Sequence, residues 1–153
     1  MPDSQDPNEF EDAVVQLEDL LRHVNSVTRR QGRRILREFD LTPPQHNALV
    51  QLHRQGNLTI GELSENLYLA FSTATDLINR MERNGLVARE RDTIDRRVVR
   101  VNIMPKGEEL LKEVVQARRR YYEELLREVP HTERQELVTA LRRIDELMSE
   151  RDP

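Results

Sequence analysis

The chain has 153 residues, of which 37% are hydrophobic and 34% charged, with a formal net charge of −4 and no cysteine. This length suits one domain with helical extensions, and so polar a composition favours amphipathic helices that bury a stripe against a partner chain. The absence of cysteine excludes disulfides and thiolate metal sites. No apolar run exceeds five residues, so we expect no membrane span. No signal peptide is visible, so we expect a cytoplasmic location.

The N-terminal third reads as an acidic start followed by one long helix. Residues 1–9 are expected to be an acidic, disordered N-terminus, and a helix is predicted over about 8–38. Its apolar residues recur at spacings of four and three, the pattern of a helix seam: Phe10, Val14, Leu17, Leu21, Val24 and Val27. Arginines then crowd residues 29–37. They could face a bound polyanion or pair with acids of a neighbouring helix, and we favour a solvated, salt-bridged face.

Two capping boxes mark the next helices. Thr42 caps a helix with Pro43 in its first turn and Gln45 completing the box, and Gly56 ends it. Thr59 and Glu62 form the second box, at the start of a short helix over about 60–67.

A further helix is predicted over 71–83. Its buried stripe is Ala74, Leu77, Ile78 and Met81, at helical spacing, and Asn84-Gly85 ends it. The outward face carries hydroxyls, an amide and arginines, the groups that hydrogen-bond base edges and phosphates. These residues are Ser72, Thr73, Thr75, Asp76, Asn79, Arg80 and Arg83.

A two-stranded hairpin follows. Residues 86–90 and 98–103 are predicted strands, and the loop 91–97 between them is too polar for a core, so it would project as a wing. A helix with a polar outer face beside a cationic hairpin indicates a reader of double-stranded DNA, although some helix-turn-helix proteins bind no DNA.

Two more helices complete the chain. One is predicted from 105 to about 129, where Pro130 would break it, and Thr132 and Gln135 would cap a sixth helix. The first, fifth and sixth helices together present more apolar stripe than one small lobe can bury.

The motifs in this order resemble the MarR family, the multiple-antibiotic-resistance regulators. The match rests on residues 41–45, 72–75 through 80–82, 84–87, 95–97 and 103–107, and extends over about 10–150. Residues 95–97 (Asp-Arg-Arg) match the D-x-R signature of the family's wing. Met104 stands where the family usually has threonine, and Ala70 leaves the 71–83 helix without a side-chain cap.

The resemblance implies a mainly α fold: six helices with a two-stranded β wing. It implies a helical dimerisation region at 10–40 and 105–150, and a winged helix-turn-helix lobe at 41–104 that binds DNA. The absence of cysteine removes the thiol chemistry of the family's peroxide sensors. Phe71 would touch a thymine methyl or pack against the wing, and we favour packing.

The charge distribution fits this interpretation better than the net charge does. Residues 1–21 contain seven acids and no base, residues 22–37 six arginines and no acid, and residues 78–100 seven arginines against four acids. The local field, not the total charge, steers a protein onto a polyanion. Of the 24 basic residues, 22 are arginine, which suits phosphates and guanine edges, although a codon-biased genome explains the ratio more simply.

We therefore expect a homodimeric, sequence-specific DNA-binding transcriptional regulator, a repressor that a small-molecule effector releases from a pseudo-palindromic site. The major-groove set is Ser72, Thr73, Thr75, Asp76, Asn79 and Arg80. Arg96 or Arg97 would enter the minor groove, with Asp95 pairing with Arg97 to hold the wing and leaving Arg96 freer. Arg83, Arg89 and Arg91 would contact phosphates.

The resemblance places the effector between the dimer helices and the DNA-binding lobe, with His23, Arg30, His46 and Tyr121 as candidates. The alternative function is a winged-helix protein–protein interaction module that does not bind DNA. No motif supports an enzyme, a cofactor or a metal: two histidines seven apart, His46 and His53, are a weak zinc signal.

Overall fold

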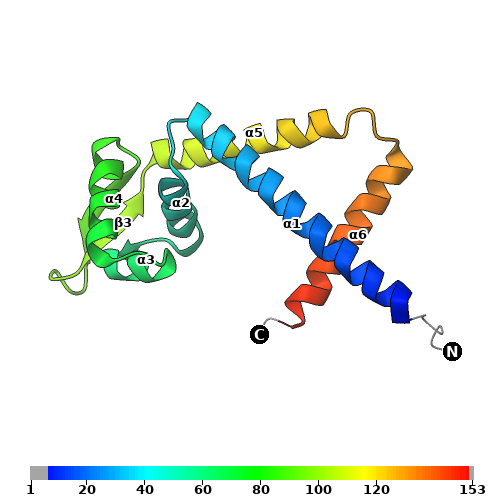
Figure 1. The fold of residues 1–153 in the computed structure, drawn as a ribbon. Coiled ribbons are helices and arrows are strands. Elements are labelled where there is room, and N and C mark those ends of the chain that lie inside the picture. Colours follow the sequence, from blue (N-terminus) through cyan, green and yellow to red (C-terminus); the bar gives the residue numbers. More distant parts are fainter. Residues whose placement is uncertain (1–6, 152–153) are drawn as a thin grey trace. The chain divides into compact units, whose positions relative to one another are not determined.

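The computed structural model describes residues 7–151 of the chain. It divides into two compact units, the first ending at Val115 and the second beginning at Gln116. The elements in chain order are α1 (Pro7–Glu38), α2 (Pro43–Gln55), β1 (Leu58–Thr59), α3 (Ile60–Asn66), α4 (Phe71–Arg83), β2 (Val87–Arg91), β3 (Val99–Ile103), α5 (Pro105–Leu125) and α6 (His131–Ser149) (Figure 1).

The described residues confirm the predicted fold class, with six helices and a small antiparallel sheet. β2 and β3 form the expected hairpin, with Arg89 opposite Val101. The sheet has three strands in the order β1-β3-β2, however, because Leu58 of β1 also lies opposite Val101, on the other edge of β3. β1 was not predicted from the sequence, because two residues are too few to show an alternating pattern.

The core of the first unit lies among α2, α3, α4, the sheet and the first half of α5. Figure 1 shows α2, α3, α4 and the sheet gathered in one lobe. The largest fully buried side chains are Leu49, Leu52, Leu63, Ile78, Met81, Val87, Val101 and Val114. The predicted stripe of α4 is confirmed for Ala74, Ile78 and Met81, while Leu77 is half-buried. Because one face of α4 is fixed in this core, its opposite face is held toward solvent.

Both capping boxes of this unit are confirmed. The amide of Gln45 donates to the Thr42 hydroxyl at 3.4 Å, and the Gln45 side chain accepts from the Thr42 amide at 2.9 Å. The amide of Glu62 donates to the Thr59 hydroxyl at 3.1 Å, and the Glu62 carboxylate accepts from the Thr59 amide at 2.7 Å. These boxes fix where α2 and α3 begin, and so the turn that leads to α4.

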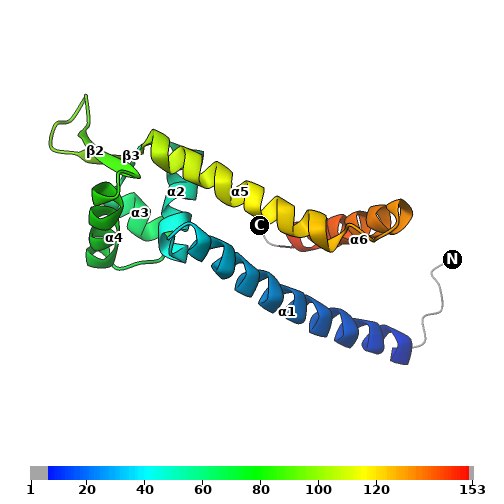
Figure 2. The ribbon, with the colours of Figure 1, turned by 90° about the horizontal axis from the view of Figure 1, so that it is seen from above.

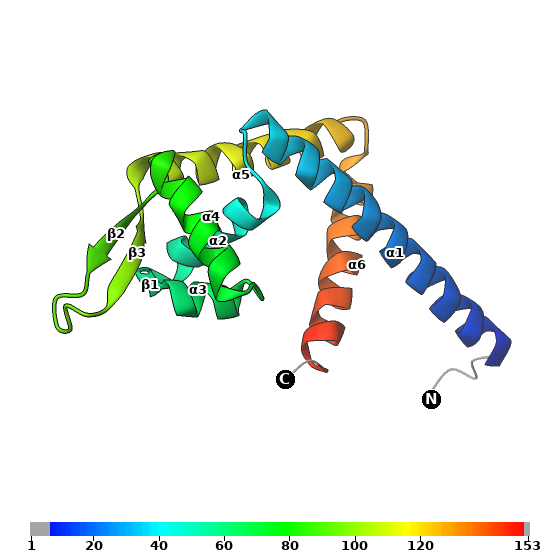
Figure 3. The ribbon, with the colours of Figure 1, turned by 60° about the vertical axis from the view of Figure 1, so that its left-hand side comes forward.

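The β2–β3 hairpin projects beyond the helices of its lobe. Figures 2 and 3 show its loop extending past α3 and α4 in two different views. The hairpin leaves α4 through Gly85, whose φ of +71° is the left-handed conformation that glycine adopts readily after a helix. The polar face of α4 and the wing loop therefore both belong to one lobe.

The start of α5 packs closely against the end of this hairpin. A Cβ atom on Gly107 would lie 2.5 Å from the Leu86 carbonyl oxygen and 2.9 Å from Cγ1 of Ile103. Only glycine permits this approach of a helix to a backbone. Gly32 in α1 differs, because a Cβ there would meet nothing within 4 Å.

Two expectations for the C-terminal helices were wrong. α5 ends at Leu125, not near 129, because the chain tightens into a turn in which the Arg127 amide donates to the Glu124 carbonyl. The cap of α6 is the backbone of Pro130, with ψ of 151° and no side-chain cap hydrogen bond. Thr132 lies inside the helix, so it does not form the predicted capping box.

The expectation of a disordered N-terminus over residues 1–9 was wrong for residues 7–9, which belong to α1. Residues 1–6 lie outside the described part of the chain.

Phe71 does not pack against the wing, as we had favoured, since the residue is 61% exposed. Across residues 7–151, no helix combines the length and the apolarity that a membrane crossing needs.

Candidate nucleic-acid interface

The outward face of α4 presents most of the predicted polar set to solvent. Six of its residues are exposed: Ser72, Thr73, Asp76, Asn79, Arg80 and Arg83. Thr75 is half-buried, and its hydroxyl donates to the Phe71 carbonyl at 2.9 Å, so this residue is partly committed to the helix itself. Ala70 provides no side-chain cap, as expected. Donors and acceptors therefore cover one side of a rigid helix.

Arg89 connects the hairpin to this helix. Its amide donates to Glu82 Oε1 at 3.1 Å, and its guanidinium forms an ion pair with the same carboxylate. The second guanidinium nitrogen donates to Asn79 Oδ1 at 2.7 Å. The Arg89 side chain is only 24% exposed. The guanidinium group of Arg89 is thus occupied by Glu82 and Asn79 of α4, which argues against the predicted phosphate contact.

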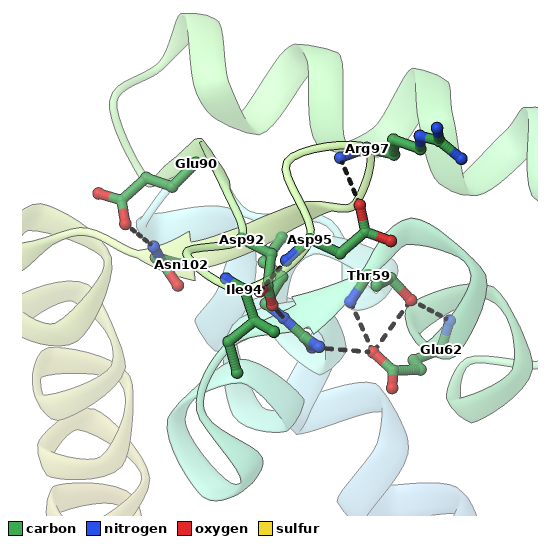
Figure 4. Close-up of polar contacts among 9 residues, drawn as sticks. Thr59, Glu62, Glu90, Asp92, Ile94, Asp95, Arg97 and Asn102 are labelled. Carbon is green, nitrogen blue, oxygen red and sulfur yellow. Dashed lines mark hydrogen bonds and ion pairs between the residues drawn. The ribbon is translucent and has the colours of Figure 1, made fainter.

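The wing loop is organised by Asp92. Its Oδ1 accepts from the Ile94 amide at 2.8 Å and the Asp95 amide at 3.2 Å, while its Oδ2 accepts from Arg100 Nε at 2.5 Å (Figure 4). The Arg100 side chain, followed by the two amides, lowers the pKa of Asp92 from its ordinary value of 3.8 to about 2. The carboxylate therefore stays ionised at neutral pH and holds the loop from both sides.

Arg100 also reaches toward the start of α3. It lies 3.8 Å from Glu62 Oε2, and the residue opposite it in the sheet is Thr59. The pKa of Glu62 is lowered, first by its bond to the Thr59 amide and then by the Thr59 hydroxyl, with a smaller contribution from Arg100. Through Arg100, the capping box and Asp92 form one polar cluster that joins the start of α3 to the wing. Figure 4 shows Thr59, Glu62 and Asp92 close together.

Asp95 contacts Arg97, but not through its guanidinium. Asp95 Oδ1 accepts from the Arg97 amide at 3.0 Å, and Figure 4 shows the Arg97 side chain extending away from the carboxylate. The Arg97 guanidinium is therefore no less available than that of Arg96. Within the described part of the chain, the guanidinium groups of Arg91, Arg96 and Arg97 make no hydrogen bond or ion pair, and all three side chains are exposed.

Sequence reasoning missed Asp92, Arg100 and Glu82, the three residues that hold this surface in shape. Asp92 carried a usable signal, because an aspartate two residues before a turn amide often accepts from it. The partners of Arg100 and Arg89 depend on strand register and tertiary packing, which a local pattern does not contain.

The four candidate effector residues do not form one site in either unit. His23 and Arg30 are exposed on α1 and line different shallow hollows, while His46 is buried and 7% exposed. Tyr121 belongs to the second unit, with its ring edge-to-face against Tyr122 at 5.2 Å between centroids. In the span from 7 to 151, no three His, Asp or Glu residues are grouped so as to hold a metal ion.

Comparison with known proteins identifies the family. The MarR family model matches residues 41–99. The uncharacterized HTH-type transcriptional regulator YsmB of Bacillus subtilis (strain 168) is 46% identical over 112 residues, which are 73% of this chain and 77% of that protein. The structure of a MarR family protein from Bacillus stearothermophilus is 43% identical, covers 91% of this chain and 97% of its own, and has a TM-score of 0.76.

The chain belongs to the MarR family. The resemblance inferred from its motifs is therefore confirmed, and so is the role of transcriptional regulator that the relatives' names carry. A structure of an S. aureus MepR mutant bound to an oligodeoxyribonucleotide shares the fold, with a TM-score of 0.71 over 86% of this chain and 97% of that one. At 20% identity this likeness concerns the MarR winged-helix fold alone.

Proposed function

We propose that this MarR-family chain binds double-stranded DNA sequence-specifically as a homodimer and represses transcription. The observation that carries the proposal is one lobe that places the polar face of α4 beside a wing with three unpaired arginines: Arg91, Arg96 and Arg97. A helix of this kind fits the major groove, and an arginine-bearing wing fits the adjacent minor groove. The same fold in the S. aureus MepR mutant is seen with an oligodeoxyribonucleotide.

The roles of the individual residues follow from their positions. Ser72, Thr73, Thr75, Asp76, Asn79 and Arg80 would face base edges, with Asp76 accepting from cytosine N4. Arg96 and Arg97 would enter the minor groove, and Arg83 and Arg91 would contact phosphates. Arg89 leaves the set of phosphate contacts, because its guanidinium is held by Glu82 and Asn79. Asp95 keeps a role in wing shape through the Arg97 amide.

The second copy is proposed from apolar side chains that each unit leaves exposed. On α1, Phe10, Leu17, Leu20 and Val24 are between 44% and 62% exposed. On α6 no residue is buried, and Leu137, Leu141 and Met148 are between 46% and 61% exposed. Exposed apolar stripes of this extent mark contacts with another chain. Two copies would place two recognition helices about 34 Å apart, which requires a pseudo-palindromic site.

Repression and its release by a small molecule are proposed from the family membership. A ligand would act by binding one spacing of the two recognition helices more tightly than the other. His23, Arg30, His46 and Tyr121 remain the proposed lining of that site, which would form in the dimer. The cytoplasm, where bacterial DNA lies, is the proposed location.

The direct experiment is to select genomic fragments on the purified protein, sequence them and map the protected bases. The proposal predicts an inverted repeat with half-sites one helical turn apart, and a complex that contains two chains of 18.1 kDa. Transcription from such a site should fall when the protein is added. Retention of fragments with no common motif, or specific capture of a protein with no affinity for duplex DNA, would favour the interaction-module alternative.

A further inference from the structure

The Arg89–Asn79 contact fixes the direction of an amide on the proposed DNA-reading face. Asn79 is exposed on α4, and its Oδ1 accepts from the Arg89 guanidinium at 2.7 Å. An asparagine amide has one accepting end and one donating end, so fixing the first also fixes the second. No hydrogen bond from Asn79 Nδ2 is found in the described range 7–151.

The orientation of the Arg89 side chain is fixed, because Arg89 is held at several points. Its backbone amide and one guanidinium nitrogen are bound by Glu82, one helical turn from Asn79, and its side chain is 24% exposed. The planar guanidinium therefore presents its remaining nitrogen to Asn79 in a set orientation. Arg83 adds a bond from its Nε to the Asn79 carbonyl at 3.3 Å, which leaves the Asn79 side-chain amide unaffected.

We infer that Arg89 is a positioning residue for base recognition, turning the Asn79 amide so that Nδ2 donates to guanine. This inference rests on the proposed function. An unconstrained asparagine pairs with adenine, accepting from N6 and donating to N7. Guanine offers two neighbouring acceptors, N7 and O6, which match an amide whose NH₂ group faces the groove.

The test measures base preference at each operator position, using the half-sites obtained from genomic selection. Wild-type protein, Arg89→Met, Asn79→Ala and the double variant are compared on duplexes carrying all four base pairs at each position. Asn79→Ala identifies the position that Asn79 reads. The wild type should prefer guanine there, and Arg89→Met should lower that preference about tenfold in favour of adenine. In the Asn79→Ala background, Arg89→Met should change nothing further at that position.

Glu82→Gln is the matched control. It removes the charge opposite Arg89 but keeps a side-chain oxygen that accepts from the same Arg89 donors, so Arg89 should stay oriented toward Asn79 and the guanine preference should be preserved. Since each preference is a ratio within one variant, a general loss of stability does not alter it.

Three results would overturn the inference. They are a wild-type preference for adenine at the Asn79 position, a uniform loss of affinity in Arg89→Met with no change of preference, and a shift in Glu82→Gln equal to that in Arg89→Met. Absence of any preferred sequence in the wild type would instead refute the proposed function. The two failures are therefore distinguishable.

Discussion

Asp92 and Arg100 hold the wing of this MarR-family protein between them, with Arg100 Nε donating to Asp92 Oδ2 at 2.5 Å. The other carboxylate oxygen accepts the amides of Ile94 and Asp95. One ionised side chain thus fixes the loop that carries the wing arginines. A flexible loop would lose conformational entropy on entering a groove, whereas a fixed loop has already lost it.

The order of the wing should depend on pH in a defined direction. The pKa of Asp92 is about 2 in the folded protein against its ordinary 3.8, so its contribution is fully present above 3.8 and is lost as the pH falls through about 2. Amide NMR signals of Ile94 and Asp95 should therefore hold their positions from pH 8 to 5 and shift only in strong acid. Asp92→Ala should show the shifted signals at neutral pH. A transition near pH 6 would contradict this assignment.

Asp92 should matter more to DNA binding than Asp95 does. Asp92→Ala removes three hydrogen bonds of the loop, and Asp95→Ala removes the one that Arg97 donates from its backbone. We expect Asp92→Ala to weaken duplex binding by roughly three- to tenfold more than Asp95→Ala, the effect of about one net hydrogen bond. Fluorescence anisotropy with a labelled half-site duplex measures both. Equal losses would return the wing-holding role to Asp95.

The two threonines that the sequence marks as helix caps should differ in stability. Thr59 caps α3, whereas Thr132 lies inside α6. Thr59→Ala should lower the free energy of unfolding by about 1 kcal/mol, the usual cost of losing a cap. Thr132→Ala should leave it within about 0.5 kcal/mol of the wild type, as for most surface changes. Urea denaturation of the two variants gives the comparison, and a larger loss at Thr132 would contradict the structure.

A pair of glycine variants tests the packing of α5. Gly107→Ala would bring Cβ within 2.5 Å of the Leu86 carbonyl oxygen, so we expect destabilisation of about 1–3 kcal/mol. Gly32→Ala meets no neighbour, and alanine favours the helix by about 1 kcal/mol, so stability should rise. Thermal unfolding should shift in opposite directions. A stable Gly107→Ala protein would mean that α5 does not approach the strand this closely.

The sequence predicted what depends on local pattern and failed where distant contacts decide. Thr42, Thr59 and Gly85 correctly predicted helix boundaries, because helix caps and left-handed glycines depend only on contacts within a few residues of the chain. Thr132 has the sequence pattern of a capping residue but forms no capping box, because α6 already begins after Pro130.

For the candidate site, the exposed face of α4 followed from helical spacing, as Asn79 and Arg80 illustrate. The partners of Arg89 could not be predicted in this way, because they lie seven and ten residues away on another element. From the sequence alone, the arginines of this stretch were therefore equally good candidates for DNA contacts. The strand register shows that Arg89 is paired with α4 whereas Arg96 is unpaired.

The most direct test of the account is the salt dependence of duplex binding in the wild type and in a variant with Arg96→Ala and Arg97→Ala, with Arg142→Ala on α6 as the control. If the wing arginines contact DNA, log affinity should fall linearly with log salt, and each arginine that makes a good groove contact should cost about 1–3 kcal/mol when replaced. The control should bind as the wild type does. Affinity that does not change with salt, or a double variant that matches the wild type, would contradict it.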